Sequence, residues 1–182
     1  QDRIRTYVEK GGHVLILVDP DTQTGLDPLL AHWGLGLGPG VLVDLQDRLA
    51  QGDLTALLVR TFTEHEITQD LSSAVLFPLS RHITFDEQAG KDWDYVPLAR
   101  TSANSWAETN MQGRVVSLNE TEDVKGPLSM AAALAPKKIP EEGAPRPAIV
   151  VVGNSTFVTN AFFNFPGNSD FFLHTAGWLA EE

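Results

Sequence analysis

Two apolar runs decide the fold of this chain: residues 13–19 (HVLILVD) and residues 148–153 (AIVVVG). Neither run alternates between apolar and polar residues, as a strand with one solvated face would. Continuous apolar strands are typical of sheets that are covered on both faces, and most of these sheets are parallel. We therefore expect both runs to lie as covered neighbours in one central sheet.

The elements around the first run indicate an α/β domain. Apolar residues at helical spacing predict a helix over residues 4–8, which Gly11 and Gly12 end. A second helix is expected over residues 26–30, and a strand over residues 41–44. Helices and strands that alternate in this way favour a sheet with helices packed on it.

The rest of the chain is less regular. Residues 128–134 are small and apolar, and fit either a strand or a buried helix. Residues 136–147 contain four prolines and predict a solvated loop or hairpin tip. A helix that Asn168 or Ser169 can cap is expected at the end of the chain. Further strands are expected at residues 56–59, 74–79, 96–100 and 115–118.

Length and charge bound the function. A chain of 182 residues fits one domain, residues 1–182. The net charge of −11 disfavours nucleic acid and anionic membrane surfaces as partners. The absence of cysteine excludes disulfides, thiolate nucleophiles and cysteine-based zinc sites. No apolar run approaches the roughly 20 residues of a membrane span. The chain opens on Gln1 in helix-like sequence, so we expect it to be excised from a longer, membrane-anchored protein.

One motif raises the possibility of catalysis. Residues 153–157 (GNSTF) follow an apolar strand, as the G-x-S-x-G elbow of hydrolases does, but Phe157 replaces the second glycine. Asp170 and His174 follow Ser155 in the order of a hydrolase triad, although they are only four residues apart on one predicted helix. A serine hydrolase is therefore an alternative that we disfavour, and the turn is expected to bind local backbone instead.

Two other patterns do not support a cofactor or a metal. The glycine-rich residues 34–40 (GLGLGPG) follow a helix and precede a strand, whereas a dinucleotide loop follows a strand and opens a helix. The five histidines are scattered and form no HxH or HExxH pattern. We expect no cofactor, no metal and no catalytic residue.

Polar residues after the strands suggest where a ligand would bind. In open α/β sheets, ligands bind outside the carboxyl ends of the strands. A tryptophan beside amide and hydroxyl side chains suits a small polar, sugar-like ligand, although Trp106 also fits a buried anchor and Asp19 a cap. The candidate ligand-binding residues are Asp19, Asp21, Asn104, Ser105, Trp106, Asn154 and Ser155.

Four stretches in order resemble a known family. They are residues 7–20 (YVEKGGHVLILVDP), 65–68 (HEIT), 98–108 and 151–179, the last containing VVGNSTFVTN, GNSDFF and GWL. The sequence resembles the ABC-type uncharacterised transport system domain, found in gliding-motility-associated auxiliary proteins of ABC transporters. It departs from the usual family pattern at Glu66, Asn154 and Thr156, where proline and two aspartates are usual.

The resemblance implies a fold and a setting. The implied fold is a three-layer α/β sandwich with a mostly parallel central sheet, flavodoxin-like and related to class I glutamine amidotransferases. The implied location is extracytoplasmic, with anchoring segments outside residues 1–182 and with ABC transporter membrane and ATPase subunits as partners. A similar domain occurs in an intraflagellar transport protein. The amidotransferase relatives use a cysteine nucleophile, which this chain lacks.

The function we expect is a non-catalytic binding or scaffolding domain of an ABC transport system's auxiliary component. The main alternative is a sugar- or small-molecule-binding module that delivers cargo to the transporter.

Overall fold

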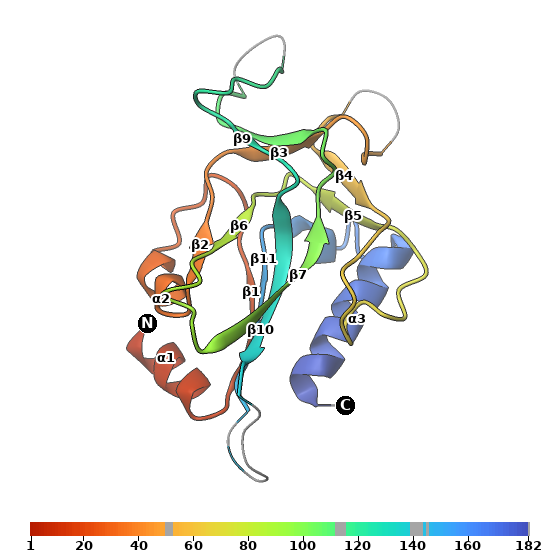
Figure 1. Ribbon diagram of the computed structural model, residues 1–182. Helices are drawn as coiled ribbons and strands as arrows, with labels where there is room; N and C mark the ends of the chain where they lie inside the picture. The colour runs from red at the N-terminus through yellow and green to blue at the C-terminus, as the bar shows by residue number, and fades with distance from the viewer. Residues whose placement is uncertain (50–52, 112–115, 139–143, 145, 182) are drawn as a thin grey trace.

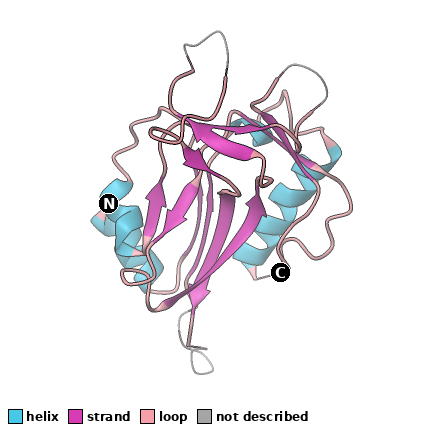
Figure 2. Cartoon of the chain, turned by 45° about the horizontal axis from the view of Figure 1, so that its top comes forward, coloured by secondary structure: helices cyan, strands magenta, loops and turns pink. Residues whose placement is uncertain are grey.

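A four-stranded sheet forms the centre of the molecule, with helices on both of its faces (Figure 1). The structure is a computed structural model, and it describes residues 1–49, 53–111, 116–138, 144 and 146–181. The turned view in Figure 2 shows the strands lying between the helices.

The helices are α1 (Asp2–Glu9), α2 (Asp27–His32), the 3-10 turn η1 (Thr156–Val158) and α3 (Pro166–Ala180). The strands are β1 (His13–Leu17), β2 (Leu35–Leu37), β3 (Val41–Asp44), β4 (Ala56–Val59), β5 (Val75–Pro78), β6 (Ile83–Phe85), β7 (Trp93–Arg100), β8 (Ser105–Glu108), β9 (Val124–Lys125), β10 (Ser129–Pro136) and β11 (Ala148–Val152).

The central sheet has the strand order β1-β11-β10-β7. The two apolar runs are confirmed as neighbouring strands: β1 and β11 are parallel, with His13 opposite Ala148 and Leu17 opposite Val152. The β10 strand runs antiparallel to both β11 and β7. Three small antiparallel sheets complete the fold, with orders β2-β6, β3-β8-β9 and β4-β5.

The expected flavodoxin-like sandwich with a mostly parallel sheet is wrong. The described residues form mostly β structure, and β1–β11 is their one parallel pairing. Parallel neighbours need a long crossover, whereas antiparallel neighbours do not. The strand β10 precedes β11 and runs against it, so the sheet is mixed. A short run of apolar residues indicates a buried strand, but it does not show whether that strand runs parallel or antiparallel to its neighbours.

Apolar side chains pack on both faces of the central sheet. On the face of α3, the rings of Phe77, Phe157 and Phe171 contact one another, with centroids 5.4 to 5.9 Å apart. On the face of α1 and α2, the core includes Val8 and Trp33, which are fully or almost fully buried. Burial of these side chains stabilises the sheet between the two groups of helices.

The two edges of the central sheet are finished differently. The chain after β4 lies along the β7 edge, where Phe62 forms a bridge with Ala99 and the Thr63 amide donates to the Leu98 carbonyl at 3.2 Å. At the other edge, β1 has one strand neighbour in the described part of the chain, which is β11. The residues of β1 are only partly buried, whereas all of β11 is buried. The expectation that both runs are covered neighbours is therefore right for β11 and wrong for β1.

Other local predictions differ in outcome. The ambiguous residues 128–134 belong to a strand, β10, while residues 116–118 are not in a strand and residue 115 lies outside the described residues. The predicted loop at 136–147 falls largely outside the described residues. Helix α3 begins earlier than expected, at Pro166, so that Asn168 lies inside it and is buried.

Candidate functional site

The ends of β1 and β11 meet, and they bring Asp19 and Ser155 into contact. We call these two residues and Asn154 the carboxyl-end rim. The Ser155 amide donates to Oδ1 of Asp19 at 2.6 Å, and the Ser155 hydroxyl donates to Oδ2. Because the two strands are parallel, their carboxyl ends lie at the same edge of the sheet. Asp19 and Ser155, two of the predicted ligand residues, thus contact each other, and both carboxylate oxygens are used within the protein.

Asn154 is completely buried and ties the rim to β5. Its Nδ2 donates to the carbonyls of Pro78 and Leu79, the latter at 3.3 Å. Its Oδ1 accepts the Phe157 amide at 2.8 Å. Buried amides that are satisfied in this way position the backbone. Asn154 is therefore not exposed to a ligand.

Arg81 is a rim residue that the sequence did not single out. Its Nη1 donates to the Asp19 carbonyl at 3.3 Å, and its Nε and Nη2 donate to the Gly38 carbonyl at 3.2 and 2.9 Å. Burial lowers the pKa of Arg81, and the nearby carboxylates of Asp27 and Asp21 oppose this shift. Asp21, predicted as a ligand residue, is exposed and has a φ of 55°. The arginine thus balances the charge of an acidic loop.

The glycine-rich residues 34–40 have a packing role. A Cβ atom at Gly38 would lie 2.0 Å from the His82 ring, so no larger residue fits there. His82 is 3% exposed, and both burial and Arg81 lower its pKa. The sequence predicted a flexible connection from a helix to a strand, whereas residues 35–37 of this run form strand β2, paired with β6.

The described residues do not contain the predicted alternative of a catalytic triad. In the described part of the chain, no histidine hydrogen-bonds to Ser155; His174 directs Nδ1 at the Ile67 carbonyl, 3.2 Å away. Within the same residues, no three His, Cys, Asp or Glu side chains are grouped in a way that would hold a metal ion.

The predicted residues Asn104, Ser105 and Trp106 belong to a separate network on the β3-β8-β9 sheet. Trp106 is 4% exposed and its Nε1 donates to Oε2 of Glu108 at 3.0 Å. The Ser105 hydroxyl donates to Oγ1 of Thr101 at 2.6 Å. The Trp106 ring is thus an anchor of this sheet, and its face is not open for stacking.

Asp44 organises the turn that follows β7, and its role was not predicted. It is completely buried. Its Oδ1 accepts the amides of Gln46 and Asp47 at 2.8 and 3.0 Å and the Ser102 hydroxyl at 2.7 Å, while Oδ2 accepts the Ser102 amide at 2.7 Å. A buried carboxylate needs such donors to offset its desolvation. Burial, followed by the charge of Asp44, raises the pKa of Asp47, which Arg60 opposes.

A cavity of about 320 Å³ lies beside this network. Its size is at the lower end of the range for small-molecule sites, roughly 300–1,000 Å³. Three of the predicted ligand residues contribute to its wall, which is formed by Leu45, Ala103, Asn104, Ser105, Trp106, Val116, Ser117, Leu118 and Lys125.

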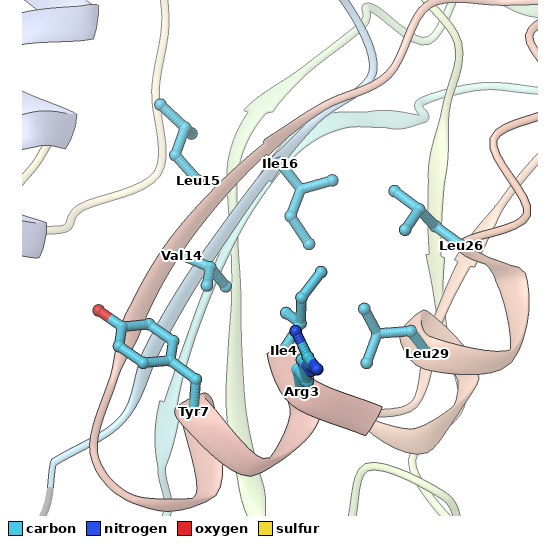
Figure 3. A pocket seen from close by; sticks show the side chains of 8 residues that line it. All are labelled: Arg3, Ile4, Tyr7, Val14, Leu15, Ile16, Leu26 and Leu29. Carbon is cyan, nitrogen blue, oxygen red and sulfur yellow. The ribbon is translucent and has the colours of Figure 1, made fainter. Parts of the chain in front are cut away.

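A second hollow, which we call the β1 groove, is almost wholly apolar (Figure 3). It measures about 310 Å³ and lies between α1, β1 and α2. In Figure 3, Ile4, Ile16 and Leu29 converge on its centre. Ile4 and Tyr7 are 40% and 54% exposed. The groove is lined by Arg3, Ile4, Tyr7, Val14, Leu15, Ile16, Leu26 and Leu29.

The comparisons with known proteins place the chain in a family. The model of the family described as "ABC-type uncharacterized transport system" matches residues 1–175. The chain belongs to this family. The predicted resemblance is thus confirmed, and the ABC-type transport family supplies the coarse role of an auxiliary transport component.

A solved structure shares the fold of this family member. It is described as "mmIFT52 N-terminal domain", is 14% identical in sequence and superposes with a TM-score of 0.64. The match covers 98% of this chain and 69% of the other. At this identity the likeness concerns the fold alone. A search of curated proteins finds no match.

No helix among the described residues has the length and apolar character needed to cross a membrane.

Proposed function

We propose that this chain is a non-catalytic binding or scaffolding domain in the auxiliary component of an ABC transport system. The family supports the transport setting. The proposal extends the family's coarse role to the ATPase and membrane subunits as direct partners. It also includes an extracytoplasmic location, with anchoring segments outside residues 1–182.

One observation carries the non-catalytic part of the proposal: Ser155 closes a turn on Asp19 with both its amide and its hydroxyl. A serine nucleophile needs a base that is oriented by a third group and free to take up the proton. Asp19 instead receives two hydrogen bonds from the same residue. Asp19 and Ser155 therefore join β1 to β11, and Asn154 joins β11 to β5.

Two experiments test this proposal. The full-length protein is co-expressed with the ATPase and membrane subunits of its transport system, and we expect a stoichiometric complex and an altered rate of ATP hydrolysis. Separately, ester, amide and phosphate substrates are offered to the purified protein. Turnover that disappears in a folded Ser155→Ala variant would show that the domain is an enzyme.

A second candidate function is recognition of a small polar ligand, because Asn104, Ser105 and Trp106 line the 320 Å³ cavity. A ligand present at 100 times its Kd stabilises a folded protein by about 2.7 kcal/mol. Thermal shift with a panel of sugars, peptides and nucleotides measures this effect. Lys125→Ala, at the cavity wall, should reduce the shift, and Lys137→Ala serves as the matched control at a lysine that does not line the cavity. A panel without any shift would rule out this candidate for those ligand classes.

A further inference from the structure

The open edge of β1 presents unpaired peptide groups. The Val18 amide donates to the Val152 carbonyl at 2.9 Å, which fixes the phase of the parallel ladder. Alternate residues of a strand direct their peptide groups to opposite sides. Val14 and Ile16 therefore face β11, whereas Leu15 and Leu17 direct their N–H and C=O groups away from the sheet. A row of such groups is a template for another strand.

The side chains along this edge are as apolar as those of an interior strand. Val14 and Ile16 contribute to the β1 groove on one face, and Leu15 and Leu17 pack towards the α3 core on the other. Figure 3 shows Leu15 pointing away from Ile16 and Val14 across the strand. Edge strands usually carry charged residues, proline or a bulge that blocks pairing. The described β1 has none of these between Val14 and Leu17.

Helix α1 indicates the direction in which a strand on this edge would run. It is joined to β1 through Gly11 and Gly12, and its buried Val8 packs on the same face as α2. A helix that packs on a sheet and leads directly into a strand has the arrangement of the second half of a βαβ unit. In such units the strand before the helix lies in the same sheet, parallel to the strand after it.

We propose that a β-strand preceding α1 in the full-length protein lies parallel to β1 and fills its open edge. This inference concerns the domain's own completion, so it stands apart from the proposed transport function. The strand would pair with the peptide groups of Leu15 and Leu17 and place alternate side chains over the β1 groove. Because both faces at this edge are apolar, the strand should be a run of about five residues rich in Val, Ile and Leu.

Amide hydrogen exchange in the purified full-length protein tests the proposal. The Leu15 and Leu17 amides should exchange as slowly as those of Val14 and Ile16, which already face β11 and serve as internal controls. An unpaired, solvated edge amide would exchange roughly a hundredfold faster. Slow exchange that is independent of protein concentration, with no partner added, is the expected result.

Disulfide trapping gives a second measurement in the same protein. Residues 1–182 contain no cysteine, so Leu17→Cys introduces the one thiol of this part of the chain. Paired with a cysteine scanned through the segment before α1, it should crosslink at a few positions two residues apart. Fast exchange at Leu15 and Leu17 would overturn the proposal. So would protection that appears only at high concentration, which would indicate a second copy, or only with transporter subunits present.

Discussion

The two edges of the central sheet differ in whether their backbone N–H and C=O groups have hydrogen-bond partners. At β7, residues 62 and 63 close the edge through the Phe62–Ala99 bridge and the Thr63 amide. At β1, the peptide groups of Leu15 and Leu17 have no described partner, and an apolar groove lies beside them. An exposed apolar edge strand is a template for pairing with another strand. The described residues thus close the sheet at the β7 edge and leave the β1 edge without a second strand neighbour.

Proline substitution gives the largest expected effect. It tests which residues of β1 direct their N–H groups towards β11 and which direct them to the open edge. In residues 1–182, Ile16→Pro should cost about 2 to 3 kcal/mol more than Ile16→Ala, because it removes a donor that faces β11 and adds a clash. Leu15→Pro should cost less than about 1 kcal/mol more than Leu15→Ala, because its N–H faces the open edge. Urea denaturation measures both differences. Equal differences would contradict the assigned phase. In the full-length protein, Leu15→Pro should become as costly as Ile16→Pro.

Substitution of Asp44 tests how strongly the turn at Ser102, directly after β7, is stabilised, because Asp44 accepts hydrogen bonds from that turn. Asp44→Asn keeps the shape of the side chain but replaces one acceptor oxygen with a donor, which then faces an N–H group. We expect a loss of about 2 kcal/mol in the free energy of unfolding. The matched variant Asp19→Asn, at the partly exposed rim beside β1, should cost about 1 kcal/mol. Denaturant titration of both variants checks the order, and a larger loss at Asp19 would contradict it.

The smallest effect is a pH dependence in the segment that closes the β7 edge. Burial lowers the pKa of His65 from its ordinary value of 6.5, and Glu66 and Asp94 oppose this shift. The Ile67 amide donates to Nδ1 of His65 at 3.1 Å, a bond that requires the neutral ring. The unfolded chain therefore binds the proton more readily than the folded one. The contribution of neutral His65 to the free energy of unfolding is fully present above about pH 6.5. It falls as the pH drops below that value, by at most about 1.4 kcal/mol per pH unit.

The variant His65→Gln should flatten this acid slope, as measured by denaturation between pH 7 and pH 5. His82→Gln is the matched comparison, because the pKa of His82 is also lowered, by burial and then by Arg81. A loss of amide exchange protection at Ile67 in acid, corrected for the intrinsic pH dependence of exchange, present in the parent and absent in His65→Gln, would place the effect in the closing segment. An unchanged slope in His65→Gln would show that this segment does not contribute.

The sequence predicted the parallel pair at the centre of the fold but not the sheet around it. Continuous apolar composition identified β1 and β11 because burial alone selects such residues. The direction of β10 depends on the length of its connections and on pairing with β7, which composition does not reveal. The fold class was wrong for this reason. The incomplete covering of β1 was missed because an edge strand that another element covers has the composition of an interior strand.

The candidate site was predicted in part. Asp19 and Ser155 were both named as candidates at strand ends, and their contact follows from the parallel pairing of β1 and β11. The grouping of Asp19 with Trp106 was not found, since each is held by its own hydrogen bonds. Asp44 and Arg81 were missed because their importance comes from distant partners, Ser102 and Gly38. A buried carboxylate at the end of a short apolar strand, as in residues 41–44, was the available signal for Asp44.

The side-chain amide of Asn168 links helix α3 to two other elements and so affects how the domain responds to force. Inside α3, its Oδ1 accepts the Leu76 amide at 2.7 Å, and its Nδ2 donates to the carbonyls of Leu76 and Phe157 at 3.0 and 3.1 Å. These three bonds fasten the first turn of the helix to β5 and to η1. A pulling force applied at the far end of α3 would therefore reach β5 and η1 directly. The helix, the small β4-β5 sheet and η1 should move as one lever when the domain is loaded.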